Sequence, residues 1–441
     1  MTPTFTFVDL FSGIGGFRIA LENHGGRCLG FSEIDTRATN VYKQNFIDFS
    51  NLDEIELGSI TGINELPFRA DLIVGGVPCQ SWSVAGKMRG FEDPRGKLWM
   101  DTIRVINLNR PKAFIFENVK GLFDPRNKKN LDLICNSFAD LEYKVNTKLL
   151  KSYDFGVPQN RERIFIVGIR SNLKGVSNFE FPLPVYERPK LYQFINGMQT
   201  AVLFEKKKFS PTEIYGDKIP YSRNRFQTDT ELNDFFVFCD TRNGHTTIHS
   251  WELVKTTTRE KQICETFLRN RRKKKYGPAD GNPISLDLLK QLIPKLKQQE
   301  MRALIKKNIF RVVPNRGYEF VNSKNSAGIN NIYRIYLPQS NIFSTITATG
   351  TKDYVALDLI SGATPQEYKC NFIRAIIKKK RYRQLSSKEA GALQGFPNNF
   401  VHDSSDKFAL KQFGNAVSVP VIEHLIDQLK QTGVFIPRGD S

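Results

Sequence analysis

The chain has 441 residues, 40% of them hydrophobic, and a net charge of +19. This length and apolar content suit two domains with substantial cores, and no apolar run approaches the roughly 20 residues of a membrane span. No basic and apolar leader precedes the first strand, and the six cysteines form no Cys-x-x-Cys pair, which argues against a disulfide scaffold and a zinc site. We expect reduced thiols and a cytoplasmic protein.

The positive charge is unevenly distributed along the chain. Residues 1–178 carry 23 Lys and Arg against 20 Asp and Glu, a net charge of +3, whereas residues 179–441 carry +16. A polyanion is the natural partner of such a surface, because phosphate contacts release counterions. A solvated basic face that only aids solubility is the alternative. The basic clusters at 206–208, 269–275 and 378–383 favour nucleic acid.

The first predicted elements form a strand, a glycine-rich turn and a helix. The strand covers residues 5–11, and the turn is Ser12-Gly13-Ile14-Gly15-Gly16. Arg18 replaces the last glycine of Gly-x-Gly-x-x-Gly, so a pyrophosphate is not the obvious ligand. A second strand, at 28–32, ends at Glu33, where an acidic side chain commonly binds ribose hydroxyls. A ribose without a pyrophosphate fits S-adenosylmethionine; the alternative is that the glycines only let a helix pack closely on a strand.

A cysteine follows the next apolar run. Leu72 to Val74 opens into Gly75-Gly76-Val77-Pro78-Cys79-Gln80, which is typical of a central strand that ends at the ligand-binding edge of an α/β sheet. Pro78 restricts the backbone before the thiol, so we interpret Cys79 as a nucleophile held in a set direction. A buried Cys79 that acts as a small hydrophobic residue is the alternative.

Strands and helices continue to alternate up to residue 170. We expect helices at 36–46, 97–108 and 127–141, and strands at 71–75, 113–117, 143–151 and 163–170. This order predicts an α/β fold with a mostly parallel, doubly wound sheet. The strand at 113–117 brings Glu117 to the same edge as Cys79, and Arg161 and Arg163 are candidates to meet that carboxylate. A helix cap and ordinary surface charges are the alternatives.

From about residue 179 the sequence becomes irregular, aromatic and basic, up to about residue 380. Aromatic residues interleaved with charges suit contacts to bases and phosphates, although any domain also needs an aromatic core. The spacing of His245 and His249 could hold a metal ion on a helix, but the intervening Thr-Thr-Ile favours a strand. We therefore predict no metal site. Order returns at 383–397 with an N-capped helix and a turn, and the chain ends in an apolar helix.

Six motifs together resemble the DNA (cytosine-5) methyltransferase family of bacterial restriction–modification systems. They cover about 5–170 and 381–425, and comprise Asp9-Leu10-Phe11-Ser12-Gly13-Ile14-Gly15-Gly16-Phe17, Gly76-Val77-Pro78-Cys79-Gln80, Glu117-Asn118-Val119, Gln159-x-Arg161-x-Arg163, Leu393-Gln394-Gly395-Phe396-Pro397 and Gly414-Asn415-Ala416-Val417. Two positions depart from the family pattern. Ser59 stands where an aspartate often binds the cofactor's adenine amino group, and Ala416 stands where serine is frequent.

The resemblance implies a doubly wound, Rossmann-like S-adenosylmethionine-dependent methyltransferase domain and a smaller, irregular target-recognition domain. We expect the catalytic domain at 1–178, completed by about 408–441, and the small domain at 179–407 with a target-recognition insertion at about 180–380. The implied enzyme is a DNA (cytosine-5-)-methyltransferase. It would methylate carbon 5 of a cytosine in a specific duplex DNA sequence, release S-adenosylhomocysteine, and protect host DNA from a partner restriction endonuclease. We expect a monomer on the nucleoid, without a membrane partner or a stable endonuclease complex.

The resemblance also implies a mechanism. Cytosine needs added electron density before its carbon 5 attacks a sulfonium methyl group, and Cys79 would supply it by adding to carbon 6. Glu117, protonated near neutral pH, would hydrogen-bond ring nitrogen 3. Arg163 would orient Glu117, and Arg161 would lie near the thiol and the base. The base must be flipped out of the duplex, and the loop 83–99 would close over it.

Further site residues follow from the same resemblance. The cofactor positions are Phe11, Gly13, Gly15, Gly16, Glu33, Ile34, Ile60, Pro78, Leu98 and Asn415. The candidate DNA contacts are Gln80, Ser83, Lys87, Arg89, Arg95, Lys97, Arg271, Arg272 and Lys273. Two other functions remain open. A relative with these motifs methylates transfer RNA, against which the long basic insertion argues, and a non-catalytic binding protein would be expected to lack Cys79 or Glu117.

Overall fold

The computed structural model divides the chain into two compact units, which we describe separately. Unit 1 comprises Met1–Pro189, Ser344–Gly350 and Ser386–Ser441, and unit 2 comprises Lys190–Phe343 and Thr351–Leu385. The structure describes residues 4–47, 54–78, 97–187, 189–200, 236–238 (backbone only), 248–279, 281–321, 334–338, 340–348 and 353–436. In the described part of the chain, no helix is long and apolar enough to cross a bilayer.

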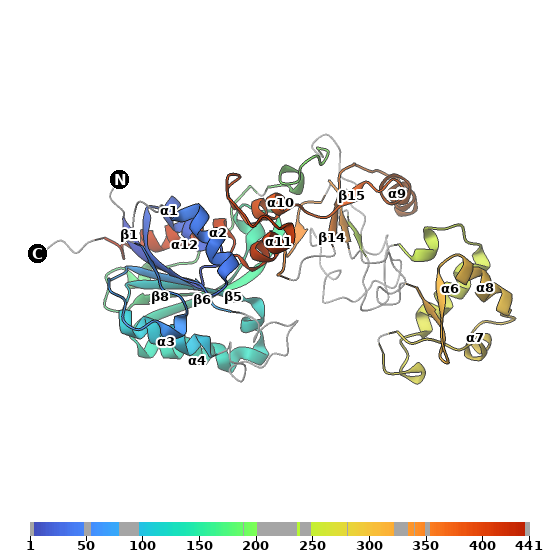
Figure 1. Ribbon diagram of the computed structural model, residues 1–441, viewed down its shortest axis with the longest axis horizontal. Coiled ribbons are helices and arrows are strands. Elements are labelled where there is room, and N and C mark those ends of the chain that lie inside the picture. Colours follow the sequence, from blue (N-terminus) through green and yellow to red (C-terminus); the bar gives the residue numbers. More distant parts are fainter. Residues whose placement is uncertain are drawn as a thin grey trace, which may run out of the picture. The chain divides into compact units, whose positions relative to one another are not determined.

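Unit 1 is built on a seven-stranded sheet with the order β3-β2-β1-β4-β5-β8-β6 (Figure 1). The first five strands in this order are parallel, whereas β8 runs antiparallel to both β5 and β6. The strands are β1 (Phe5–Leu10), β2 (Gly26–Ser32), β3 (Ile55–Glu56), β4 (Leu72–Gly76), β5 (Ala113–Val119), β6 (Tyr143–Lys151) and β8 (Glu162–Arg170).

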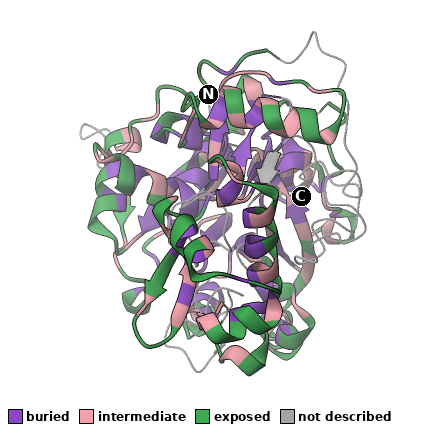
Figure 2. Ribbon diagram, turned by 90° about the vertical axis from the view of Figure 1, so that its right-hand side faces the viewer, coloured by how far each residue is buried: buried purple, intermediate pink, exposed green. Residues whose placement is uncertain are grey.

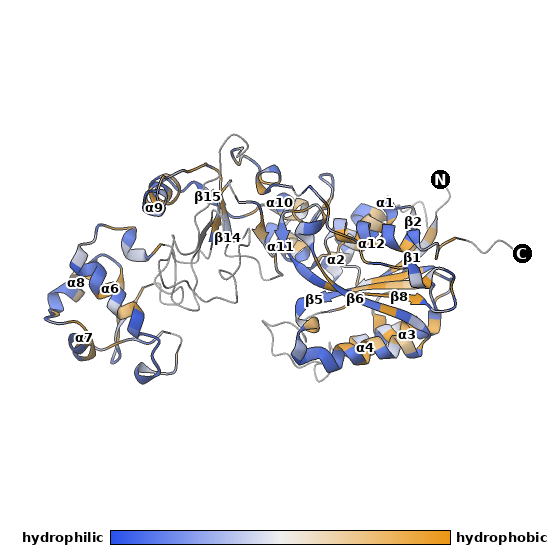
Figure 3. Cartoon of the chain, turned by 180° about the vertical axis from the view of Figure 1, so that it is seen from behind, coloured by the Kyte–Doolittle hydropathy of each residue, from blue (hydrophilic) through white to orange (hydrophobic). Residues whose placement is uncertain are grey.

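Helices cover both faces of this sheet, with α3 and α4 on one face and α1, α2 and α12 on the other (Figure 1). They are α1 (Gly16–Asn23), α2 (Thr36–Phe46), α3 (Leu98–Asn109), α4 (Lys128–Asp140), α10 (Ser387–Ala392), α11 (Asp406–Asn415) and α12 (Val419–Gln431). Strands buried on both faces must be apolar throughout, and the residues of 72–74 and 113–116 are fully buried. Figure 3 shows the resulting hydrophobic sheet between more polar helices.

These elements confirm the predicted fold class and most of the predicted boundaries. The predicted helix at 36–46 is α2, and the other predicted helices and strands of this region are displaced by at most two residues. The predicted N-capped helix near the end of unit 1 is also present, since Ser386 and Glu389 form a capping box at the start of α10. Residues 344–350 and 386–407 group with unit 1, whereas the sequence places them in the small domain.

Unit 2 contains a four-stranded sheet with the order β15-β14-β12-β9. Its strands are β9 (Phe236–Phe238), β12 (Arg334–Tyr336), β14 (Asp353–Ala356) and β15 (Tyr382–Arg383), and α9 (Pro365–Phe372) packs with them through a shared apolar cluster. β13 (Phe343–Ser344) lies where the chain passes back into unit 1. This sheet accounts for part of the region that we expected to be irregular.

A second group of elements in unit 2 has its own hydrophobic core. It contains α6 (Thr258–Asn270), α7 (Leu286–Leu292), α8 (Gln298–Lys306) and the hairpin β10 (Phe310–Val313) and β11 (Gly317–Phe320). In Figure 2, the helices carry both buried and exposed residues, as expected for helices with one face toward a core and the other toward solvent. The sequence does not predict these helices, because they lie in a region without clear alternation of strands and helices, and α7 and α8 have only seven and nine residues. His249 precedes a 3₁₀ turn (Ser250–Glu252) rather than a strand.

Candidate active site

The carboxyl ends of four parallel strands meet at one edge of the sheet in unit 1. Leu10 of β1 pairs in register with Ser32 of β2 and Gly75 of β4, and Gly76 pairs with Glu117 of β5. The segments that leave these strands therefore start side by side. In open α/β sheets this edge is where ligands bind.

The glycine-rich turn after β1 has a left-handed backbone. Phe11, Gly13 and Gly15 have φ values of 52°, 55° and 89°. A side chain at Gly15 would also place its Cβ 2.2 Å from the ring of Phe46, so only glycine fits there. Phe11 adopts this conformation with a full side chain, which is uncommon and concentrates at functional sites.

Glu33 holds this turn in place. One carboxylate oxygen accepts a hydrogen bond from the Gly13 N–H at 2.8 Å, and the other accepts from the N–H groups of Ile34 and Asp35 at 2.8 Å. A carboxylate has about four acceptor positions, so one remains for another donor. The structure thus fixes Glu33 beside the turn and orients it through backbone donors.

The three predicted walls of the adenine slot differ in exposure. Ile34 is 77% exposed, which is unusual for a large apolar side chain next to an ordered carboxylate. Leu98 is half-buried against the core of unit 1, and Ile60 is 3% exposed within that core. Ser59 caps the 3₁₀ turn that begins at Ile60, with its hydroxyl accepting from Thr61 N–H at 3.4 Å.

Asp9 carries a fully buried carboxyl group next to the last residue of β1. Neither of its carboxylate oxygens has a hydrogen-bond partner among the described residues. Burial raises the pKa of the Asp9 carboxyl well above its usual value, although the nearby Arg18 opposes the shift. The first motif contains this residue, but the sequence alone does not single it out.

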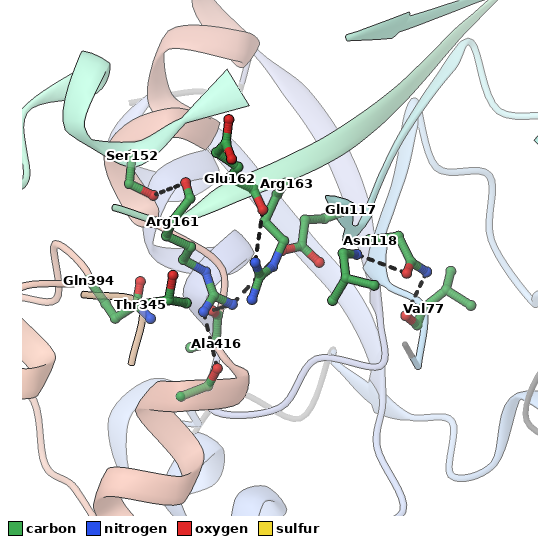
Figure 4. A network of polar contacts seen from close by, with 12 residues as sticks. Val77, Glu117, Asn118, Ser152, Arg161, Glu162, Arg163, Thr345, Gln394 and Ala416 are labelled. Atoms are coloured by element: carbon green, nitrogen blue, oxygen red, sulfur yellow. Dashed lines mark hydrogen bonds and ion pairs between the residues drawn. The ribbon is translucent and has the colours of Figure 1, made fainter. Parts of the chain in front are cut away.

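Glu117 lies at the end of β5 and is 8% exposed. The Nε of Arg163 is 2.9 Å from its Oε1, and Nη2 of Arg161 is 3.9 Å from the same oxygen (Figure 4). Arg163 therefore lies where the sequence predicts, in contact with the carboxylate. Since both arginines approach Oε1, Oε2 is the oxygen left for another partner.

Arg161 is 2% exposed and donates hydrogen bonds to three backbone carbonyls. Nη1 contacts the oxygens of Ile346 and Gly414 at 3.3 and 3.2 Å, and Nη2 contacts that of Ala416 at 2.7 Å (Figure 4). The carbonyls of Gly414 and Ala416 flank Asn415, a predicted cofactor residue that is itself exposed. Arg161 thus fastens two segments that are distant in sequence, around residue 346 and at 414–416, to the edge of the sheet.

Two buried glutamines complete this attachment. Both belong to the six motifs, but the sequence does not predict a role for either. The side chain of Gln159 donates to the Leu393 carbonyl at 2.8 Å and accepts from Ile346 N–H at 3.2 Å. The side chain of Gln394 donates to the Phe413 carbonyl at 2.8 Å. Motif residues far apart in sequence are therefore joined by side-chain to backbone hydrogen bonds.

Asn118 connects Glu117 to the loop that contains Cys79. Its amide donates to the carbonyl of Val77 at 3.1 Å and its oxygen accepts from Val119 N–H at 2.8 Å, with no exposure to solvent. Val77 and the half-buried Pro78 are the last described residues before Cys79. The entry into that loop is therefore anchored on β5.

Three of the described cysteines, Cys28, Cys135 and Cys264, are poor nucleophiles. Burial raises the pKa of the Cys28 and Cys264 thiols well above their usual value and that of Cys135 to about 11, and only the thiolate form is reactive. Cys370 is exposed, in unit 2. Among the described residues, no group of three or more His, Cys, Asp or Glu side chains is placed to hold a metal.

Several predicted site residues lie outside the described residues, namely Cys79, Gln80, Ser83, Lys87, Arg89 and Arg95. Lys97 is exposed at the start of α3, and Lys273 is exposed with its Nζ on Asn270 at 2.7 Å. Arg272 is half-buried. Arg271 is 1% exposed and stacks 5.7 Å above the ring of Phe320, so the prediction that it contacts DNA phosphates is wrong.

The model of the C-5 cytosine-specific DNA methylases matches residues 5–431. The chain is 46% identical to Type II methyltransferase M.HgiBI of Herpetosiphon aurantiacus over 431 residues, 98% of each chain. It is 33% identical to Type II methyltransferase M.BanI of Aneurinibacillus aneurinilyticus, over 97% of this chain and 96% of the relative. Type II methyltransferase M.HpaII of Haemophilus parainfluenzae is 31% identical, over 95% and 87%.

Solved structures share the fold at low sequence identity. The methyltransferase EhMeth of Entamoeba histolytica superimposes with a TM-score of 0.52 at 15% identity, covering 97% of this chain and 98% of its own. The Dnmt2 methyltransferase of S. pombe gives 0.51 at 12% identity, with the same coverage.

Proposed function

Since the chain belongs to the C-5 cytosine-specific DNA methylases and is a DNA cytosine-5-methyltransferase of the restriction–modification type, we propose that it uses S-adenosylmethionine and attacks a flipped-out cytosine through Cys79. The observation that supports this best is the arrangement around Glu117. Arg163 holds that carboxylate, and its neighbour Asn118 holds the backbone two residues before Cys79. Strand β5 therefore carries the proposed acid, Glu117, and also holds the start of the loop that contains Cys79.

The described residues fit the cofactor. Glu33 keeps an acceptor position for a ribose hydroxyl, and the exposed Ile34 offers an apolar surface for an adenine ring. Among the described residues, no atom lies within 4 Å of a Cβ added at Gly13, so these residues leave space beside the turn. When bound, S-adenosylmethionine would supply the electrophilic methyl group. Asn415, held by Arg161 through its neighbours, completes the set.

The chain's own residues would prepare the base. The thiolate of Cys79 adds to carbon 6 of cytosine, which makes carbon 5 nucleophilic. Glu117, with Oε1 occupied by Arg163, shares a proton with ring nitrogen 3 through Oε2 and stabilises the charge that develops there. After methylation, loss of the proton from carbon 5 expels Cys79 and restores the aromatic ring. The base must leave the duplex for this chemistry.

We also propose that the modification protects host DNA against a cognate restriction endonuclease. The support is the printed names of relatives such as M.HgiBI and M.BanI, which are Type II methyltransferases. Binding to duplex DNA is assigned to the basic part of the chain after residue 178, which has a net charge of +16.

The test is methylation by the purified full-length protein. Tritiated S-adenosylmethionine is offered with duplex DNA or with transfer RNA, and bisulfite sequencing then maps the modified atom and its sequence. We expect 5-methylcytosine at one short DNA sequence, and none with Cys79→Ala. Labelled transfer RNA with unlabelled DNA would support the alternative substrate instead.

A further inference from the structure

Residues 251–321 form a compact part of unit 2 whose elements follow a familiar order. Helix α6 is followed by an antiparallel bridge between Ile284 and Tyr318, then by α7, α8 and the hairpin β10–β11. This is the order of a helix-turn-helix motif with a β-hairpin wing. In Figure 1, α6, α7 and α8 lie close together. We call residues 251–321 the helix-turn-helix module.

The turn between α7 and α8 is tightly fixed. Leu296 N–H donates to the Ile293 carbonyl at 3.2 Å, and Lys295 adopts a left-handed conformation with φ of 58°. Arg259 of α6 donates to the Pro294 carbonyl at 2.9 Å and pairs with Glu300 of α8 at 2.9 Å. The direction of α8 relative to α6 is therefore held from both the turn and the helix start.

Helix α8 has one buried face and one polar face. Met301 and Leu304 are fully buried in the module's core. The exposed residues recur at helical spacing and are Gln298, Gln299, Arg302, Ala303 and Lys306. Arginine pairs with guanine and glutamine with adenine through two hydrogen bonds each in the major groove. In helix-turn-helix proteins, the first residues of the second helix read base edges.

The module's charge fits the same partner. Residues 281–321 carry eight Lys and Arg against three Asp and Glu. Two of these carboxylates are already engaged, Glu300 with Arg259 and Glu319 with Arg311. Within the described residues, Arg302 and Lys306 have no ion-pair partner, nor does Arg316, which is exposed at the tip of the hairpin. These cations remain free to meet phosphates or bases.

We infer that the helix-turn-helix module reads the DNA target, with α8 in the major groove and Arg316 at the hairpin tip on the sugar–phosphate backbone. This rests on the proposed function, because it takes duplex DNA as the substrate. Gln299 and Arg302 of α8 would then determine which sequence is methylated.

The experiment uses the full-length enzyme on genomic DNA, with bisulfite sequencing of the modified sites and measurement of kcat/KM on the wild-type target. Arg302→Ala should lower kcat/KM on that target by about 5- to 150-fold and relax the choice at one base pair. Arg302→Lys keeps the charge but loses the paired geometry, and should relax the same base pair with little change in the salt dependence of binding. Gln299→Ala should relax a different position.

Arg316→Ala should weaken binding to all sequences and reduce the slope of log affinity against log salt by about 1. Lys261→Ala is the matched control, because Lys261 is an exposed cation on α6, and it should behave like the wild type. Thermal unfolding within about 2 °C of the wild type shows that each variant is folded.

Three results would overturn the inference. If Arg302→Lys and Gln299→Ala methylate the wild-type sequence at the wild-type rate and methylate no other sequence, α8 does not read DNA, while the proposed function stands. If Lys261→Ala loses as much activity as Arg302→Ala, general charge and not this face is responsible. If the wild type itself leaves every cytosine unmethylated, the proposed function fails, and the inference fails with it.

Discussion

The side-chain amide of Asn118 donates to the carbonyl of Val77 at 3.1 Å, two residues before Cys79. One hydrogen bond thus joins the strand that carries Glu117 to the loop that carries the proposed nucleophile. Because both groups must act on the same cytosine ring, we expect the precision of the site to depend on this bond.

Replacing Asn118 should separate catalysis from cofactor binding. Asn118→Asp keeps the acceptor for Val119 N–H but loses the donor to Val77, and should lower kcat by about 10- to 100-fold, since a small misplacement can cost that much. The dissociation constant of S-adenosylmethionine should be unchanged. Asn109→Ala is the control, because Asn109 also binds backbone groups, including Val105, at the far end of α3; its kcat should be normal. A fully active Asn118→Asp enzyme would contradict the proposed anchoring.

Replacing Cys79 tests the nucleophile. Cys79→Ser should retain cofactor affinity and lose methyl transfer, because the thiol is needed to add to the base and not to hold the cofactor. Tritium incorporation and cofactor titration measure the two properties separately. Turnover above about a hundredth of the wild-type value would remove Cys79 from this role.

Glu33 should control cofactor affinity. Glu33→Gln keeps the shape but weakens acceptance from three backbone N–H groups and from a ribose hydroxyl. We expect the dissociation constant of S-adenosylmethionine to rise at least about tenfold, the loss of one good hydrogen bond to a charged group, with a smaller change in kcat at saturating cofactor. The exposed Glu65 provides the control as Glu65→Gln. Equal affinities for the two variants would exclude Glu33 from the cofactor site.

The two arginines beside Glu117 should have different effects. Arg161→Gln leaves buried carbonyls without donors and should lower the free energy of unfolding by about 3 kcal/mol. Arg163→Gln removes the ion pair with Glu117 and one hydrogen bond to the carbonyl of the adjacent Glu162, so it should reduce turnover at nearly wild-type stability. Urea unfolding and kcat measurements distinguish the two. Equal losses of stability would show that Arg163 is also a structural residue.

Acid should destabilise the helix-turn-helix module. A hydrogen bond from Lys297 N–H, with a further contribution from Arg259, lowers the pKa of Glu300. Burial would raise the pKa of Glu260, but hydrogen bonds from Lys307 and Thr257 outweigh it and lower that pKa. A carboxyl with a lowered folded-state pKa stabilises the fold above its unfolded value of about 4.3, and this contribution disappears as the pH falls through the folded-state pKa.

The measurement is denaturant unfolding between pH 7 and pH 3.5, followed by the fluorescence of the buried Trp251 in a background of Trp82→Phe and Trp99→Phe. We expect stability to fall below about pH 4.5. Glu300→Gln should make that fall shallower, whereas the exposed Glu65→Gln should leave it unchanged. A free energy of unfolding that stays constant down to pH 3.5 would contradict this prediction.

Sequence reasoning located the sheet and its ligand edge because both follow from local patterns. Apolar runs that end in Gly or in a polar residue indicate β1, β4 and β5, and the parallel order then places Glu33 and Glu117 at the same edge of the sheet. The capping box at Ser386 could be predicted from the sequence in the same way. These features depend on residues close in the sequence.

Features that depend on contacts between distant residues could not be predicted from the sequence. Arg271 belongs to a run of basic residues, for which the sequence predicts phosphate contacts, but its position at the end of α6 turns it toward Phe320. Charge runs do not reveal which member faces the core. Likewise, the three carbonyls that bind Arg161 come from residues about 185 and 255 positions away, and no local pattern indicates them.

The discontinuous make-up of unit 1 has a consequence for protein synthesis. Helix α1 packs on α12, Asn23 donates to Glu423 at 2.8 Å, and a Cβ on Gly16 would lie 2.9 Å from Val417. The ribosome therefore releases the glycine-rich turn long before its packing partners exist. Most of unit 2 is translated in between. If its helix-turn-helix module binds DNA as we propose, a growing chain would bind the genome before its cofactor site is complete and before it is able to methylate DNA.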